Sequence, residues 1–567
     1  MKRGIDLVLL WHMHQPDYRL AGPDGSDTFV LPWTYLHAIK DYADMAAHLE
    51  RHPGMRAVVN FVPILLEQIE DYAEQCATGQ LRDPLLASLA RSDLGTLSPA
   101  ERGALAAACF RVNHTTMLQP YPHYRRLHEL YELASADGDA GLAYLSGEYL
   151  SDLVTWYHLA WCGETERRAR APIARLLSRG SGFDLADRRA LLAEIGEILG
   201  GLIGRYRALG HDGRIELSAT PYAHPLAPLL LDFASARHSQ PEALLPQTPA
   251  YPGGRSRLES QIDAARQSHA ARFGASPNGM WPAEGAVSDA VIGLLGNAGC
   301  GWAASSESVL ANSIGREAFA AERDRHLHRP YRVDGHVPLL FFRDERLSDL
   351  IGFEYSRWHG SDAVGHFIAE LERIATAAPE GERPVVSVIL DGENAWEYYP
   401  YNGYYFLDHL YGSLCAHEWI RPVTFAELAG ARAHRAQRLP ALTAGSWVHG
   451  TLSTWIGDPE KNRAWDLLCA AKSCFDLAVA GDRLSAAARD AAAAQLARCE
   501  SSDWFWWLGA HNPPATTAVF DRLFRANLAR LYGLLGTPAP AELDAPIGKG
   551  GGDPEHGGTM RRAGASI

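Results

Sequence analysis

Residues Pro384 to Glu397 have the sequence PVVSVILDGENAWE, in which an aliphatic, largely β-branched run ends in three carboxylates, an asparagine and a tryptophan. The run is typical of a buried strand. A folding core gains nothing from such a polar cluster, whereas polar residues at the carboxyl ends of barrel strands form active sites. Carboxylates suit proton transfer or attack on carbon, and an indole suits stacking on a sugar ring. The segment therefore favours sugar chemistry on a parallel barrel over the alternative, a solvated acidic turn.

Short apolar runs that end in polar or aromatic residues recur through the first 425 residues. They alternate with stretches of helical character, and strand–helix alternation implies a parallel sheet. Seven strands with functional residues at their carboxyl ends suggest a barrel slightly short of the eight-stranded form. The candidate strands are Ile5–Trp11, Met55–Asn60, Arg214–Ser218, Gly279–Trp281, Gly301–Ser305, Val337–Phe342 and Val385–Leu390.

We therefore predict an α/β protein whose residues 1–425 form a catalytic seven-stranded (β/α) barrel. Residues from about 65 to 210 are rich in Ala, Leu, Glu and Arg, and predict helices inserted between the second and third strands. Amphipathic periodicity predicts an all-helical C-terminal domain over residues 426–536, which contributes to the active-site cleft. Pro, Ala and Gly dominate residues 537–567, for which we expect a disordered tail.

Composition narrows the class of protein. The chain has 567 residues, 47% hydrophobic and 21% charged, which is typical of a globular protein with more than one domain. Its net charge of −14 argues against a nucleic-acid partner, because neutralising phosphates needs a basic surface, whereas a neutral polysaccharide fits. No stretch approaches the 18 apolar residues of a membrane span. The eight Cys show no CxxC pair or zinc spacing, so we expect reduced thiols in a cytoplasmic protein with no membrane partner. Nothing in the sequence predicts an oligomeric state.

A second acidic candidate is Glu284, within Trp281-Pro282-Ala283-Glu284-Gly285. Pro282 and Gly285 predict a rigid turn that holds Glu284 out of the core at a strand end. The less favoured alternative for Glu284 alone is a surface residue at a helix start. If the barrel brings it near Asp391, the two form the carboxylate pair that glycoside hydrolysis needs.

His12 and His14 alternate along the first predicted strand, so both side chains point to the same side. There they could bind sugar hydroxyl groups. They could equally hold a metal ion together with an Asp or Glu, which is the main rival interpretation. A structural histidine pair is the third alternative.

Two later segments are rich in aromatic residues. The loop from Gly445 to Asp458 carries Trp447, Trp455 and Asp458 among glycines, which favours a sugar-contacting loop. The segment Ser501–Trp507 (SSDWFWW) could serve likewise, but bulky aromatics between a helix and a barrel favour plain core.

Five segments, in order over about 450 residues, resemble the five sequence regions of glycoside hydrolase family 57. They are His12–Pro16 (HMHQP), Gly213–Pro228 (GRIELSATPYAHPLAP), Gly279–Glu307 (starting GMWPAEGAVSDA), Val388–Glu397 (VILDGENAWE) and Gly445–Trp465 (GSWVHGTLSTWIGDPEKNRAW). FFRD at Phe341–Asp344 and LSD at Leu347–Asp349 also look like the amylopullulanase-like branch of the family rather than its branching-enzyme branch.

The resemblance implies a (β/α) barrel of seven strands followed by a helical bundle. It assigns the nucleophile to Glu284 and the general acid/base to Asp391, with no catalytic metal and no cofactor. The expected substrate-binding residues are His12, His14, Gln15, Glu216, His224, Trp281, Trp396, Trp455 and Asp458.

The expected activity is retaining hydrolysis of α-1,4 glucans, as in α-amylases and amylopullulanases, by double displacement through a covalent glycosyl-enzyme, with cleavage of α-1,6 linkages left open. Three alternatives stay open. One is a 4-α-glucanotransferase or branching transglycosylase with the same catalytic pair. The others are a metal-dependent carbohydrate hydrolase or deacetylase, and a non-catalytic glucan-binding protein.

Overall fold

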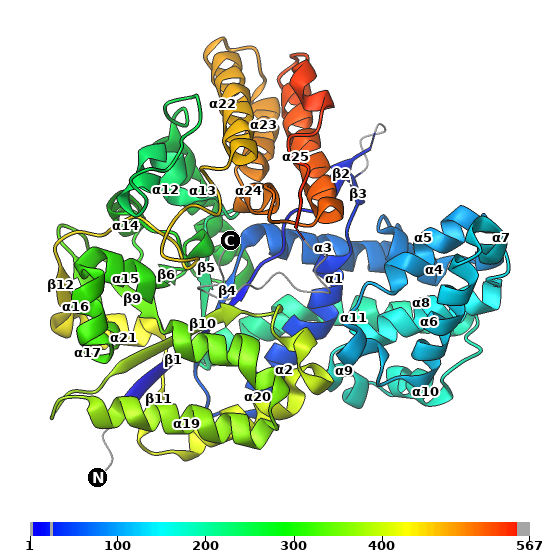
Figure 1. Ribbon diagram of the computed structural model, residues 1–567, viewed down its shortest axis with the longest axis horizontal. Coiled ribbons are helices and arrows are strands. Elements are labelled where there is room, and N and C mark those ends of the chain that lie inside the picture. The colour runs from blue at the N-terminus through cyan, green and yellow to red at the C-terminus, as the bar shows by residue number, and fades with distance from the viewer. Residues whose placement is uncertain (1–3, 23–26, 553–567) are drawn as a thin grey trace.

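The computed structural model describes residues 4–22 and 27–552, and its centre is a closed barrel of seven parallel strands (Figure 1). The hydrogen-bonded order is β10-β1-β4-β5-β6-β7-β9, and a pairing of β9 with β10 closes the ring. This confirms the predicted seven-stranded (β/α) barrel. The strands are β1 (Ile5–Met13), β4 (Ala57–Phe61), β5 (Ile215–Ala219), β6 (Gly279–Met280), β7 (Trp302–Ser306), β9 (Leu339–Arg343) and β10 (Val385–Asp391).

The register of neighbouring strands determines which functional residues lie at the same level along the barrel axis. On β1, His12 lies level with Asp391 of β10 on one side and with Asn60 of β4 on the other. All nine residues of β1 are buried. Because the strands are parallel, their carboxyl ends meet at one mouth of the barrel, where the polar residues that follow each strand gather.

Helices cover the outside of the barrel. Between the strands they are α1 (Trp33–His37), α2 (Ala43–Arg51), α12 (Ala227–Leu231), α13 (Gly254–Phe273), α14 (Asp289–Asn297), α15 (Glu307–Ile314), α16 (Arg316–Ala321), α17 (Arg323–Leu327), α18 (Glu345–Asp349), α19 (Gly360–Ala377), α20 (Tyr404–Ala416) and α21 (Phe425–Arg432). Short strands extend the sheet or stand beside it: β8 (Tyr331–Val333), β11 (Ile420–Pro422), β12 (Gln437–Leu439) and the hairpin β2 (Arg19–Ala21) with β3 (Asp27–Phe29).

A helical insertion lies between β4 and β5, at the right of Figure 1. It consists of α3 (Pro63–Thr78), α4 (Pro84–Ala90), α5 (Pro99–Cys109), the π-helix η3 (His114–Leu118), α6 (Pro122–Ser135), α7 (Gly138–Leu142), α8 (Gly147–Trp161), α9 (Glu164–Ala169), α10 (Ala171–Arg179) and α11 (Leu185–His211). Proline in the first turn starts several of these helices, where its missing N–H costs nothing.

The C-terminal helices, orange to red in Figure 1, are α22 (Pro459–Ala480), α23 (Ala486–Cys499), α24 (Ser502–Trp507) and α25 (Pro514–Leu534). The helical region was expected from residue 426, but β12 pairs with β8 at the barrel sheet, so the helices begin only at Pro459. Apolar residues of β1, of the insertion and of α25, such as Leu9, Leu153 and Leu528, belong to one continuous core.

The expected disordered tail is wrong for residues 537–552. A short 3₁₀-helix spans Ala541–Asp544, and Leu543 and Ile547 are buried. The N–H of Ile547 donates to Asp521 of α25 over 2.8 Å, because a carboxylate there offers the acceptor that the Pro- and Gly-rich chain needs. The rest of the expected tail, residues 553–567, lies outside the described residues. None of the described helices is long and apolar enough to cross a membrane.

Candidate active site

A cleft of about 970 Å³ opens at the carboxyl ends of the barrel strands. Three parts of the chain line it: the strand ends, the insertion around η3, and the C-terminal helices α24 and α25. Six of the residues predicted to act in the site line the cleft, namely His12, His14, Gln15, His224, Glu284 and Asp391.

Glu284 sits in a strained turn directly after β6. Its backbone is left-handed, with φ 59° and ψ 20°, and Gly285 follows with φ 56°. A β-carbon at Gly285 would lie 2.6 Å from the Trp281 ring, so the turn needs glycine there. Left-handed backbone at a glutamate costs about 1–3 kcal/mol and is found mainly at functional sites.

Two donors fix the carboxylate of Glu284. The indole Nε1 of Trp447 lies 3.0 Å from Oε2, and Oγ of Ser502 lies 3.0 Å from Oε1. The backbone N–H of Trp447 also donates to the Glu284 carbonyl over 2.9 Å. The carboxylate is thus held from the loop before α22 and from the start of α24.

Burial raises the pKa of both acidic candidates. The pKa of Glu284 rises to about 8, through burial and then the charges of Asp503 and Asp391, against the lowering effect of the bonds from Trp447 and Ser502. The pKa of Asp391 rises to about 6 through burial, against the hydrogen bond from Asn394 and the charges of His14 and Arg343. Near neutral pH one proton is left on the pair, and in the free protein it lies on Glu284.

Three imidazole rings stand together beside this pair. The rings of His14 and His224 stack with centroids 3.8 Å apart, and His12 lies 5.2 Å from His224. Burial lowers the pKa of His12 to about 3 and that of His224 well below its usual value, so both are neutral. Nδ1 of His12 faces Oδ1 of Asn60 at 2.7 Å, which assigns the His12 proton to Nδ1 and leaves Nε2 an acceptor.

Counting protons along this chain links the protonation of Glu284 to the orientation of the Ser502 hydroxyl. His12 Nε2 accepts from His224 Nε2 across 3.2 Å, so the neutral His224 ring must accept at Nδ1 from Ser502, 2.8 Å away. Ser502 has a single proton. It donates either to the ionised carboxylate of Glu284 or to His224, and in the second case the hydroxyl can only accept from a protonated Glu284. When Glu284 ionises, the hydroxyl must turn and leave His224 without a donor.

The first turn of α24 completes the site, which the sequence did not reveal. Nε2 of His14 lies 3.0 Å from both carboxylate oxygens of Asp503, and the N–H of Ser502 donates to the His224 carbonyl over 2.8 Å. The available signal was the polar triplet at residues 501–503, typical of a helix start, directly before four aromatic residues. Of those aromatics, Trp504 and Phe505 are core as predicted, whereas Trp506 and Trp507 line the cleft.

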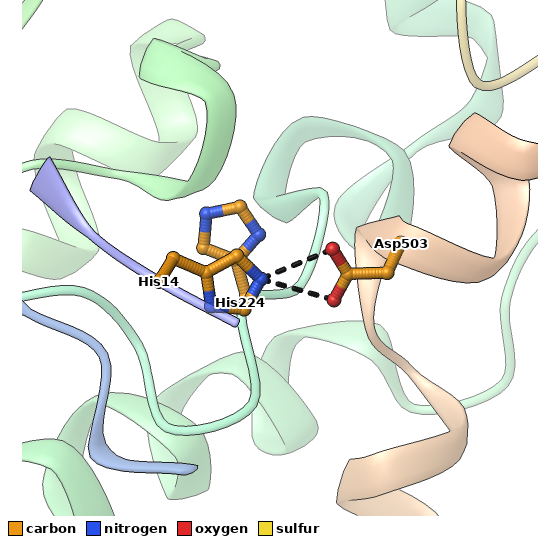
Figure 2. Close-up of side chains that lie close together, drawn as sticks. All are labelled: His14, His224 and Asp503. Atoms are coloured by element: carbon orange, nitrogen blue, oxygen red, sulfur yellow. Dashed lines mark hydrogen bonds and ion pairs between the residues drawn. The ribbon is translucent and has the colours of Figure 1, made fainter. Parts of the chain in front are cut away.

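His14, His224 and Asp503 also form the one cluster among the described residues whose ligand atoms lie within 4.8 Å of one another (Figure 2). Imidazole binds a metal through a lone pair in the plane of its ring. The rings of His14 and His224 are nearly parallel, at 17°, and stacked face to face, so their in-plane lone pairs cannot meet at one ion unless a ring rotates. Both nitrogens of His12 face other side chains, Asn60 and His224. The arrangement thus fits a hydrogen-bonded network better than a metal site.

Five predicted substrate-binding residues do not line the cleft. Trp281 is fully buried behind it, against Trp447. Trp396 is core, stacked edge-on with Trp11, and its Nε1 donates to the Gly392 carbonyl.

The other three are structural as well. Trp455 is fully buried, and Asp458 caps α22 by accepting from the N–H groups of Glu460 and Lys461. Glu216 lies two residues below Ser218 on β5, where its carboxylate accepts from Trp302 Nε1 at 2.7 Å and from the N–H of Ala426 at 2.9 Å. Each was predicted from its residue type near a strand or loop, but tertiary packing buries Trp455 and Glu216, and Asp458 is half-buried as the N-cap of α22.

A model of glycosyl hydrolase family 57 matches residues 8–443. None of the curated protein sequences compared with the chain matches it. Among solved structures, a branching enzyme from Pyrococcus horikoshii aligns with 16% identity and a TM-score of 0.57, covering 95% of this chain and 93% of its own. A branching enzyme from Thermococcus kodakaraensis aligns with 15% identity and a TM-score of 0.56, covering 94% of this chain and 90% of its own. An α-amylase from Thermotoga maritima aligns with 12% identity and a TM-score of 0.54, covering 94% of this chain and 93% of its own. At these identities the likeness concerns the fold alone.

Proposed function

The chain belongs to glycosyl hydrolase family 57, and on this premise we propose that it cleaves α-glucans with retention of configuration, Glu284 acting as nucleophile and Asp391 as general acid/base. The observation that carries the proposal is the held carboxylate of Glu284, fixed by Trp447 and Ser502 in the same cleft as Asp391. Fixing a nucleophile in its reactive orientation removes much of the entropic cost of attack.

In the first step, a carboxylate oxygen of Glu284 attacks the anomeric carbon while Asp391 gives its proton to the departing glycosidic oxygen. In the second step, Asp391 takes a proton from water, whose oxygen displaces Glu284. Two inversions give overall retention. The neutral His12 and His224 lie beside Glu284 and offer no positive charge that would oppose a developing oxocarbenium ion.

The chemical step needs the shared proton on Asp391, whereas in the free cleft it lies on Glu284. We infer that substrate moves it. Sugar hydroxyl groups that donate to Glu284 favour its ionised form, and the glycosidic oxygen beside Asp391 favours the protonated one. The productive protonation state is therefore formed mainly after the sugar binds.

Transfer to a second glucan is the other candidate activity, and one observation favours it. Four tryptophans line the cleft, namely Trp33 and Trp161, whose ring centroids lie 5.8 Å apart, and Trp506 and Trp507. Aromatic faces bind sugars and exclude water, so these residues could hold an acceptor chain near the glycosyl-enzyme. Solved structures with a similar fold include branching enzymes and a 4-α-glucanotransferase.

Mutation of the nucleophile tests the proposal. Glu284→Ala should abolish turnover of α-glucan, and azide should restore turnover of an activated α-glycoside and give a β-glycosyl azide. Glu216→Ala is the matched control, a buried glutamate at the far end of the barrel, and should stay active. Near wild-type turnover by folded Glu284→Ala would contradict the assignment.

Product analysis separates the alternatives. Proton NMR should show the α-anomer as the first product, and chelation should leave activity unchanged. Activity lost to a chelator and restored by zinc would favour the metal-dependent alternative. With a maltooligosaccharide as substrate, new reducing ends indicate hydrolysis, and products longer than the substrate indicate transfer.

A further inference from the structure

Exposed aromatic side chains gather at one place on the surface. Among the described residues, five aromatic side chains are well exposed: Tyr144, Trp358, Tyr398, Tyr401 and Tyr405. Tyr144 stands alone after α7, in the insertion. The other four, which we call the aromatic platform, come from two neighbouring segments, before α19 and before and within α20. Isolated exposed aromatics are ordinary, but a cluster of them indicates a binding surface.

The platform is continuous with the catalytic cleft. Tyr398 lines the cleft, as do Ser356 and Arg357, which directly precede Trp358. The starts of α19 and α20 touch, because a β-carbon at Gly360 would lie 3.7 Å from the carbonyl carbon of Tyr405. The rings of Tyr401 and Tyr405 lie 5.4 Å apart and nearly perpendicular.

The chain holds the platform rigid at a cost in backbone strain. Tyr401 and Asn402 are both left-handed, with φ 54° and 55°. These are two of the six non-glycine residues with positive φ in the described chain, and two others, His224 and Glu284, belong to the active site. Consecutive strained residues persist only where the surroundings fix them, and they concentrate at functional sites.

The surroundings that fix this turn are specific. The side-chain amide of Asn402 is buried and donates to Asp44 over 2.8 Å, and Asp44 also caps α9 of the insertion. The guanidinium of Arg168 lies 4.2 Å from the centre of the Tyr404 ring and donates to the Tyr405 hydroxyl over 3.0 Å. Because the rings are already ordered, a ligand that stacks on them loses little further entropy.

We propose that the aromatic platform binds the part of an α-glucan chain that extends out of the catalytic cleft. The inference rests on the proposed function. Pyranose rings present C–H faces that stack on tyrosine and tryptophan, and their hydroxyl groups can bond to the phenol hydroxyls and to Arg168. A neutral glucan suits these uncharged rings, and continuity with the cleft sets it apart from a protein partner or a second copy of this chain.

The test compares long and short substrates. The double variant Tyr401→Ala/Tyr405→Ala should raise the KM for amylose about fivefold while kcat/KM for a short maltooligosaccharide stays unchanged. Tyr144→Ala is the matched control, which removes an exposed tyrosine elsewhere and should change neither value. An equal loss on both substrates, or no loss on either, would overturn the proposal.

Direct binding separates this inference from the proposed function. Depletion onto insoluble starch, measured in a Glu284→Gln background, needs no turnover. Weaker depletion by the double variant supports the platform even if the enzyme proves to follow another mechanism. A change of oligomeric state in size-exclusion chromatography, with unchanged depletion, would assign the platform to contact between copies and overturn the proposal.

Two single variants guard against a folding artefact. Tyr401→Gly relieves the left-handed strain, so its melting temperature should not fall while starch binding weakens. Tyr405→Phe keeps the ring and should keep binding. Loss of binding only in variants whose melting temperature falls would assign the tyrosines a structural role instead.

Discussion

At the catalytic centre a pair of buried carboxyl groups shares one proton near neutral pH. The pKa of Asp391 rises to about 6 and that of Glu284 to about 8, so the pair holds two protons below pH 6 and none above pH 8. We predict a bell-shaped profile of kcat/KM between these limits. In Asp391→Asn only Glu284 titrates, so activity on an aryl glycoside, whose leaving group needs no acid, should rise with pH through a single limb. This limb should lie below pH 8, because the variant also removes the Asp391 charge that raises the pKa of Glu284. A pH profile that stays bell-shaped in this variant would contradict the assignment of the general acid/base to Asp391.

Ser502 donates its one proton to either Glu284 or His224. Ser502→Ala removes a donor from the ionised form of Glu284, which should raise the pKa of Glu284 further. We therefore predict that the alkaline limb of kcat/KM moves to higher pH and that the plateau falls, since the ionised nucleophile becomes rarer. Ser502→Thr keeps the hydroxyl and should keep the limb near its original pH. An unshifted limb in the alanine variant would mean that the contact with Glu284 is incidental.

The raised pKa of Glu284 also has a consequence for stability. Between pH 4.5 and about 8 the folded protein keeps this proton while the unfolded chain releases it, so the free energy of unfolding falls as pH rises through this window. Glu284→Gln cannot ionise. We predict that its free energy of unfolding exceeds that of wild type at pH 9 by on the order of a few kcal/mol and is close to that of wild type at pH 5. Equal differences at both pH values would show that ionisation of Glu284 is not the cause.

At the scale of elements, the loop between β12 and α22 carries two tryptophans with opposite surroundings. Trp447 donates to Glu284 at the cleft, whereas Trp455 is fully buried. Trp447→Phe should lower kcat with little change in melting temperature. Trp455→Ala should cost about 3–5 kcal/mol of stability by leaving a cavity, while the folded fraction keeps a normal KM. Activity and denaturation assays test both predictions. A loss of stability in Trp447→Phe together with a loss of activity alone in Trp455→Ala would contradict them.

This pair of tryptophans illustrates what the sequence can and cannot predict. Strands were predictable because aliphatic runs of strand length alternate with helices, and Glu284 and Asp391 because each follows such a run. Trp447 and Trp455 look alike in sequence, since only packing separates a cleft residue from a core residue. Ser502 and Asp503 lie more than 200 residues beyond Glu284 in sequence. They belong to α24, and no local sequence pattern predicts that this helix packs against the mouth of the barrel. The part that η3 plays in the cleft wall depends likewise on how the insertion packs.

At the scale of the whole molecule, barrel, insertion and C-terminal helices share one core. Leu9 of β1, Leu153 of α8 and Leu528 of α25 belong to the same continuous cluster, and the cleft needs all three parts. We predict that the protein unfolds in one cooperative transition, with equal calorimetric and van't Hoff enthalpies and with activity lost at the same temperature as tryptophan fluorescence changes. A separate, earlier transition for the C-terminal helices would show that they fold as an independent domain.

The left-handed turn at Glu284 also has a consequence for how this position evolves. Glycine, asparagine and aspartate adopt this conformation at less cost than glutamate, so these three substitutions would relieve the backbone strain. Selection for the reaction opposes them, as do the hydrogen bonds that Trp447 and Ser502 donate to the carboxylate. A lineage freed from selection for catalysis would therefore be expected to lose this glutamate early, and to persist as a well-folded, inert relative that still binds the sugar. An intact glutamate in this turn is thus a marker that selection has kept the chemistry.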